Sequence, residues 1–221
     1  RQIQALTTAQ AASLTTAQAS TLLVAQVAAL ETADLAAMST SAVAALTTAQ
    51  MQSLNSAQIA SLTSAQVRNL TTSQVAALST AQVAALETLD VSSLTTDQLQ
   101  AVSTAQMRAL DSNQAKALTS VQVAKLTTAQ LGSLTANQAA ALDTVDVAQL
   151  GTDQVRSITT AAIAGLTTSQ VNNLSTDQVK NLLSAQVGAL TSAQLTALTT
   201  AQLATLSTEQ MSALRATQVL G

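Results

Sequence analysis

The sequence has no cysteine, histidine, proline, tryptophan, tyrosine or phenylalanine, and it has only five glycines. Without cysteine there are no disulfides and no thiolate metal ligands, which fits an intracellular protein or a bacterial exported one. Without histidine and cysteine, the usual general base, thiolate nucleophile and imidazole metal ligand are missing, and the many Ser and Thr hydroxyls have no activating partner. We therefore expect no enzyme, no catalytic residue and no cofactor.

Charged residues are also scarce, since they make up 9% of the chain and leave a net charge of −3. The eight basic residues form no stripe that would favour nucleic acid or anionic lipid. No signal peptide, targeting motif or apolar run of about 18 residues is found. We expect neither nucleic-acid binding nor membrane insertion.

The chain does contain a repeat of eight residues, typified by LSTAQVAA from Leu78 to Ala85. An aliphatic residue occupies position 1 in 27 consecutive octads from Leu6 to Leu214, and position 6 is aliphatic throughout. Position 2 is Thr, Ser, Asn or Asp in 21 octads, and position 5 is Gln in 22. A helix N-cap prefers the first set, a Gln three residues later completes a capping box, and positions 1 and 6 then form a hydrophobic staple. Each octad thus predicts the start of one short helix.

The placement of charge supports this interpretation independently. All 11 acidic residues lie at positions 2 to 5, and six of the eight bases lie at positions 7 and 8. A helix favours acids in its first turn and bases in its last.

The predicted fold is an all-α solenoid with one helix of one to two turns per octad and a narrow Leu, Val and Ala core at positions 1 and 6. A continuous long helix is disfavoured, because a strict eight-residue repeat would rotate the Leu row by about 80° per octad. A β-solenoid, favoured by the many Thr and Val, competes with the helical fold. Against it, positions 1 and 6 would face opposite sides of a strand. A disordered chain is the last possibility.

We expect residues 1–221 to form one repeat domain, a fragment of a longer array whose units stack in one dimension. A second period of seven octads gives super-repeats at about 30–85, 86–141 and 142–197. This period indicates either tandem duplication or a whole number of solenoid turns. With between three and four octads per turn, the second reading would place Asp97, Asp153 and Glu209 in one column.

Acidic pairs recur at the start of each super-repeat. They are Glu31/Asp34, Glu87/Asp90 and Asp143/Asp146. We interpret each pair as an N-cap residue and its partner three residues later, which stabilise the helix start. A hard cation such as Ca²⁺ is the alternative, but it takes six to eight oxygens, more than two carboxylates supply. We expect no metal site.

The pattern LTTAQVAALTTAQ, which summarises the octads, resembles the Leu/Thr/Ala/Gln octapeptide arrays of very large bacterial surface or secreted proteins, often labelled as adhesion or haem-utilisation proteins. The resemblance covers the whole chain, implies an extended extracellular stalk or filament, and carries over no functional residue. The haem part of that label finds no support, because no His, Cys or Tyr is present to ligate iron.

Two classes of function remain. The favoured one is a structural stalk, spacer or filament at the cell surface or outside the cell, which self-associates, continues the same array, or contacts a surface or matrix component. The alternative is a binding solenoid whose variable outer face takes a protein, a glycan or ice. Regular hydroxyl pairs such as Thr47/Thr48 suit ice, but binding surfaces are usually rich in aromatics and Arg, which are absent or scarce here.

Overall fold

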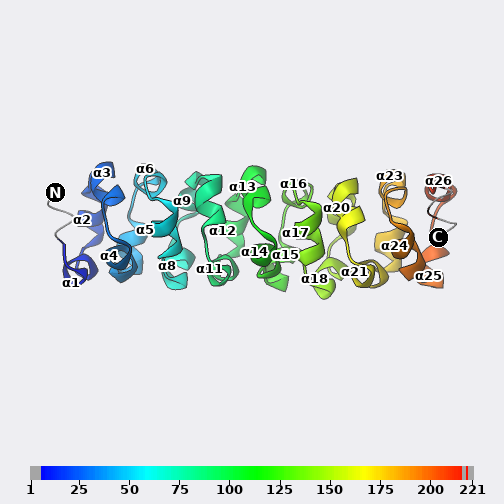
Figure 1. Ribbon diagram of the computed structural model, residues 1–221, viewed down its shortest axis with the longest axis horizontal. Coiled ribbons are helices and arrows are strands. Elements are labelled where there is room, and N and C mark those ends of the chain that lie inside the picture. Colours follow the sequence, from blue (N-terminus) through cyan, green and yellow to red (C-terminus); the bar gives the residue numbers. More distant parts are fainter. Residues whose placement is uncertain (1–5, 216–217, 219–221) are drawn as a thin grey trace. The chain divides into compact units, whose positions relative to one another are not determined.

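A computed structural model describes residues 6–215 and 218 (Figure 1). The partial unit Arg1–Ala5 and residues 216, 217 and 219–221 lie outside the described residues. Within the described part of the chain there are 26 short helices and no strand. The predicted all-α repeat solenoid with one helix per octad is therefore confirmed, and the β-solenoid and the single long helix are wrong.

The chain divides into two compact units, residues 1–109 and 110–221, which are described separately. The helices of the N-terminal unit are α1 (Thr8–Ala12), α2 (Thr16–Thr21), α3 (Val24–Ala28), α4 (Thr32–Ala37), α5 (Thr40–Ala44), α6 (Thr48–Gln52), α7 (Ser56–Ala60), α8 (Ser64–Asn69), α9 (Thr72–Ala77), α10 (Thr80–Ala84), α11 (Thr88–Ser93), α12 (Thr96–Ala101) and α13 (Thr104–Ala109). Those of the C-terminal unit are α14 (Ser112–Lys116), α15 (Ser120–Ala124), α16 (Thr128–Leu131), α17 (Ala136–Ala141), α18 (Thr144–Ala148), α19 (Thr152–Ser157), α20 (Thr160–Gly165), α21 (Thr168–Asn172), α22 (Thr176–Lys180), α23 (Ser184–Val187), α24 (Ser192–Ala197), α25 (Thr200–Leu203) and α26 (Thr208–Ser212).

Most helices begin at the predicted capping box. In α9, for example, the Thr71 hydroxyl accepts a hydrogen bond from Gln74 N at 3.1 Å, and Gln74 Oε1 accepts one from Thr71 N at 2.7 Å. The helix ends where the next position-1 residue, Leu78, adopts an extended conformation with φ −60° and ψ 140°. Local sequence therefore fixes both the start and the stop, and no helix grows long enough to be stable by itself.

The capping hydroxyls make a direct prediction for stability. The Thr167 hydroxyl accepts from Gln170 N at 3.1 Å, so Thr167→Ala should lower the free energy of unfolding by about 1 kcal/mol. Thr168→Ala is the control, because Thr168 is exposed and follows the cap. Urea unfolding midpoints would compare the two variants, and equal midpoints would contradict the role assigned to Thr167.

Positions 1 and 6 form the core, as predicted. Leu78 and Val83, from one octad, are 5% and 2% exposed. Met38, Met51 and Met107 are likewise buried in core positions. Only toward the two ends of the described chain are these positions open, as at Leu14 and Leu203. The core is therefore a narrow aliphatic column within each unit, filled by two residues from every octad.

Within each unit, every helix that has a partner three places earlier packs against it, as α6 does on α3 and α26 on α23. Figure 1 shows these helices returning to the same side of their units. The position-5 Gln of a helix can also reach the end of the helix four places earlier, since Gln74 of α9 bonds to Val43 of α5. One turn therefore takes between three and four octads, which agrees with the expected range.

The seven-octad period is close to two turns in the C-terminal unit. Arg156 at the end of α19, Lys180 at the end of α22 and Glu209 at the start of α26 line one shallow surface hollow. Arg156 and Glu209 are nearly seven octads apart in sequence, yet they share this hollow. For the C-terminal unit this proximity favours the geometric reading of the super-repeat. Asp97 belongs to the other unit and is not placed relative to Asp153 and Glu209.

Candidate functional site

The most distinctive feature of the structure is a row of buried glutamines at position 5. Gln74 is 2% exposed, and its Nε2 donates to the carbonyls of Val43 at 3.1 Å and Leu46 at 2.7 Å, one turn earlier. We call a glutamine that donates to the residue 28 positions earlier an inter-turn glutamine. Such pairs include Gln50–Leu22, Gln58–Leu30, Gln66–Met38, Gln74–Leu46, Gln82–Leu54, Gln98–Leu70, Gln106–Leu78, Gln138–Leu110, Gln154–Leu126, Gln170–Leu142, Gln178–Leu150, Gln186–Ile158, Gln194–Leu166, Gln202–Leu174, Gln210–Leu182 and Gln218–Leu190.

Each inter-turn glutamine serves two helices at once. Its Oε1 accepts from the N-cap amide of its own helix, while its Nε2 occupies carbonyls at the C-terminal end of a helix in the preceding turn. The last carbonyls of a helix have no partner within that helix, and burying them unpaired costs free energy. The glutamines therefore stabilise both ends of the short helices and hold successive turns in register. Sequence reasoning identified the cap but missed the second bond.

Two of the described octads that lack a position-5 glutamine have alanine there, at Ala42 and Ala162. At the second, α20 packs closely on α17, and a Cβ added to Gly165 would lie 2.6 Å from the Ala136 Cβ. Small side chains thus allow the two helices to approach so closely that no larger residue fits at Gly165. In this octad, close packing of two helices therefore accompanies the alanine at position 5.

The other three exceptions are the octads that begin at Leu30, Leu86 and Leu142, which we call the acidic octads. Their position-2 residues, Glu31, Glu87 and Asp143, make no side-chain cap hydrogen bond. The expectation that these residues act as N-cap acceptors is therefore wrong. In the second acidic octad, Asp90 Oδ2 accepts from Glu87 N at a long 3.3 Å, so only half of the predicted box forms. The position-2 carboxylates of the acidic octads thus do not replace the hydroxyl, whereas Asp111 in another octad does, since its Oδ1 accepts from Gln114 N at 2.7 Å.

The position-5 carboxylates of the acidic octads are buried, because Asp34, Asp90 and Asp146 are each 2% to 3% exposed. Asp90 Oδ1 accepts from the Ser64 hydroxyl at 2.9 Å, a contact from the preceding turn. Asp146 Oδ1, in contrast, is buried without any hydrogen-bond partner. An ionised carboxylate is an acceptor only, so these side chains cannot repeat the donation that glutamine makes.

Burial has a measurable consequence at Asp90. Desolvation raises the pKa of this carboxyl above its ordinary value of 3.8, and the neighbouring Glu87 carboxylate adds to the rise, while the Ser64 hydroxyl and Glu87 N–H oppose it. The helix α8, which packs on α11, contributes Arg68 as its one charged residue. The folded protein therefore holds this proton more tightly than the unfolded chain.

Protonated Asp90 therefore contributes to the free energy of unfolding below pH 3.8, the ordinary pKa of the group in the unfolded chain. We expect this contribution to be lost as the pH rises from 3.8 through the higher pKa of Asp90 in the folded protein. Urea unfolding between about pH 3.5 and about pH 7 in a chelating buffer measures the effect, with Asp90→Gln as the comparison. The difference between the two pH profiles isolates this group, and parallel profiles would contradict the assignment.

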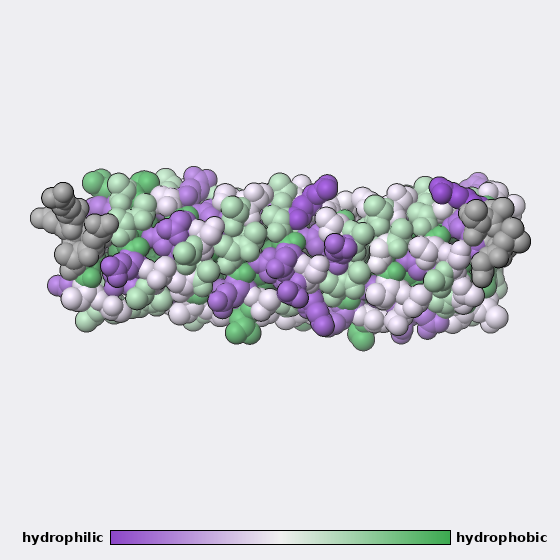
Figure 2. All heavy atoms as spheres, in the orientation of Figure 1, coloured by the Kyte–Doolittle hydropathy of each residue, from purple (hydrophilic) through white to green (hydrophobic). Residues whose placement is uncertain are grey.

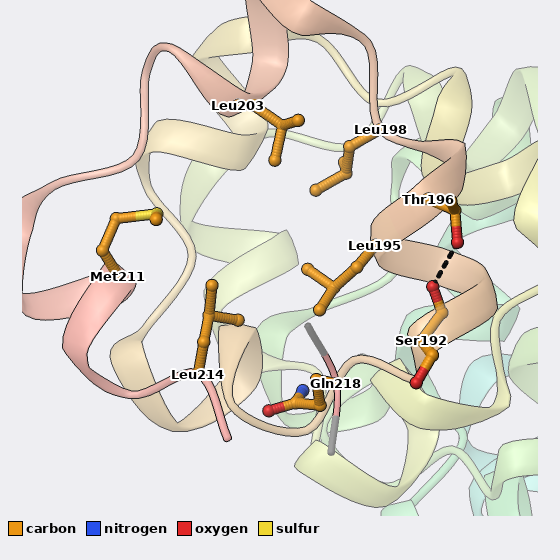
Figure 3. A pocket seen from close by; sticks show the side chains of 8 residues that line it. All are labelled: Ser192, Leu195, Thr196, Leu198, Leu203, Met211, Leu214 and Gln218. Carbon is orange, nitrogen blue, oxygen red and sulfur yellow. Dashed lines mark hydrogen bonds between the residues drawn. The ribbon is translucent and has the colours of Figure 1, made fainter. Parts of the chain in front are cut away.

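One surface hollow lies near the end of the C-terminal unit (Figure 3). Its apolar lining consists of position-1 and position-6 residues, among them Leu195, Leu203 and Met211, which is 50% exposed. Figure 3 shows no converging set of polar side chains, and its one hydrogen bond joins Thr196 to Ser192 on the same helix. The hollow is therefore an open part of the aliphatic core.

The remaining surface is mostly small and uncharged. On the face drawn in Figure 2, pale and green side chains predominate, with purple ones distributed among them. Large apolar side chains that are exposed in the described residues include Leu89, Val121 and Val145. The described residues hold no group of three or more His, Cys, Asp or Glu side chains suited to a metal ion. No helix in the same part of the chain is long and apolar enough to cross a membrane.

Comparison with known families identifies the repeat. The model of the ALTTAQ repeat matches residues 27–64, 60–88, 83–120, 91–128, 139–176, 147–184, 172–200 and 187–220. No curated protein matches the chain significantly. Because the matches cover well over half of the sequence and follow the octads that form the helical stack, the protein belongs to the ALTTAQ repeat family.

Proposed function

We propose that the chain is a non-catalytic structural element, a stalk, spacer or filament segment that lies at the cell surface or outside the cell. The observation that carries this proposal is the regular 28-residue hydrogen bond from each inter-turn glutamine to the preceding turn. Nearly every turn is held by the same bond and the same core positions, so further octads extend the stack without any new kind of contact. A stack that lengthens by adding similar units suits a protein whose role is to span a distance.

The partner in this proposal is more of the same repeat, from the same array or from another copy. The first turn carries Gln10, Gln18 and Gln26, whose Oε1 atoms accept cap amides as in later turns. The Nε2 atoms of these three glutamines stand at the octad position from which later glutamines donate to the preceding turn. The apolar hollow beside α24 and α26 exposes core residues such as Leu203 and Met211. Both surfaces thus carry the polar and apolar groups with which successive turns of the repeat contact each other.

Electron microscopy of the purified protein, over a range of concentrations, tests the structural proposal. Filaments or uniform isolated rods are the expected result, and globular particles would overturn it. Antibody labelling of intact cells that express the native protein tests the location, and labelling that requires permeabilised cells would overturn the surface assignment.

A binding solenoid is the second candidate. It is favoured by Val121 and Val145, two exposed valines on the packed helices α15 and α18. Glycan-array binding, or ice affinity measured as thermal hysteresis, would support it if Val121→Ser with Val145→Ser abolished the signal. A signal that survives the double substitution would place the binding elsewhere.

A further inference from the structure

The acidic octad Leu142–Gln149 contains an unusual buried charge. Asp146 is 3% exposed, and its Oδ1 has no hydrogen-bond partner. Asp143, three residues earlier, is exposed and its carboxylate makes no cap bond. Two like charges therefore stand at one helix start, one of them desolvated, and neither is used for capping. Left uncompensated, this arrangement is costly to the folded state.

The preceding turn presents oxygen atoms to this position. The inter-turn glutamines on either side, Gln138 and Gln154, donate to the carbonyls of Leu110 and Leu126, each 28 residues earlier. The same register places the Leu118 carbonyl opposite Asp146. Carbonyl oxygens that elsewhere meet an amide N–H here meet a carboxylate, which has no hydrogen to donate when ionised.

A serine of the preceding turn stands at the matching sequence offset. Ser64 donates to Asp90 from 26 residues earlier, and Ser120 precedes Asp146 by the same number of residues, while Asp146 Oδ1 accepts no hydrogen bond. The helices packed on α18 are α15 and α21, and neither contains a charged residue. The nearest bases in sequence are Lys116, at the end of α14, and Lys125, the C-cap residue of α15, and both are exposed. The helical residues of α15 and α21 themselves include no cationic side chain.

We propose that Asp143 and Asp146 bind a hard divalent cation of the Ca²⁺ kind, together with the Leu118 carbonyl and the Ser120 hydroxyl of the preceding turn. The two carboxylates balance the charge of the ion and provide up to four oxygens, and water fills the remaining positions of a six- to eight-oxygen shell. The two carboxylates alone would leave this shell incomplete. The ion links two turns at a place where the glutamine bond is missing, and the exposed Asp143 gives it a path from solvent.

Isothermal titration calorimetry of the chelator-treated full chain with CaCl₂, MgCl₂ and, at matched ionic strength, NaCl tests the proposal. Asp146→Gln is the decisive variant, because it restores the residue found in 22 octads and should fold normally. We expect the wild type to bind the divalent ion, with a melting temperature raised by several degrees, and Asp146→Gln to bind one ion fewer per chain. Asp143→Thr, the usual cap residue, should weaken binding while leaving circular dichroism unchanged.

Three results would overturn the proposal. The first is absence of divalent binding at millimolar concentration. The second is an Asp146→Gln variant that binds as many ions as the wild type, because the ions would then lie elsewhere. The third is a wild-type melting temperature that divalent ions do not raise above its value in NaCl at matched ionic strength.

Discussion

Replacing Leu118 with Asp should lower the free energy of unfolding of the C-terminal unit by more than about 4 kcal/mol. Leu118 is 4% exposed and occupies position 1, where each octad contributes to the aliphatic column. A carboxylate there would be surrounded by apolar side chains with no basic partner. Because each turn of a repeat protein is stabilised by its neighbours, the damage should spread to the adjoining turns and broaden the transition.

Matched controls separate burial from the chemistry of the substitution. Val121→Asp introduces the same side chain into the same octad, but Val121 is 66% exposed and lies in the first turn of α15, where an acid is favoured. Ala84→Asp tests an exposed position of the N-terminal unit. Both should change the free energy of unfolding by about 0.5 kcal/mol or less. If thermal melting gave equal losses for Leu118→Asp and Val121→Asp, the assignment of inside and outside would be wrong.

The second large effect is expected from Gln178→Glu, which keeps the shape of an inter-turn glutamine and removes only its donor. Gln178 Nε2 donates to the carbonyls of Val147 at 3.0 Å and Leu150 at 2.8 Å, and its Oε1 accepts from Ser175 N at 2.8 Å. In the variant the cap bond survives, but a buried carboxylate oxygen faces two carbonyl oxygens. We expect a loss of roughly 3 to 5 kcal/mol at neutral pH, as for an uncompensated buried charge.

Acidification should reverse most of this loss. A neutral carboxyl has an O–H that can donate to the same carbonyls, so the folded pKa of the new Glu must exceed the value of about 4.3 in the unfolded chain. The variant should therefore gain stability relative to the wild type as the pH falls through that window. Urea unfolding at several pH values measures this gain, and a loss independent of pH would show that the donor is not the important group.

Gln10→Glu is the control for this experiment. Gln10 occupies the same octad position and its Oε1 accepts from Thr7 N at 2.9 Å, but its side chain is exposed. Glu completes a capping box as well as Gln, so this variant should be close to neutral. If Gln10→Glu lowered the free energy of unfolding by a similar amount, the effect would arise from the cap and not from the bond between turns.

The acidic octads show where sequence reasoning failed. Glu87 and Asp143 stand at the cap position, and a carboxylate is an accepted capping group, yet neither side chain accepts an amide there. Each is followed three residues later by a buried Asp whose surroundings come from the preceding turn. What these residues contact is therefore determined by neighbours about 26 to 28 residues away, which no local pattern specifies.

The sequence by itself determined the helix starts, the helix stops and the two core positions, because the capping box and the staple act over at most five residues. Thr71, Gln74 and Val75 behave as the octad pattern predicts. Only the tertiary structure decided that Gln74 also binds Val43 and Leu46, since the identity of that acceptor depends on how many octads complete a turn. A cap is local, whereas a bond between turns exists only after the stack has formed and has buried both the amide and the carbonyls.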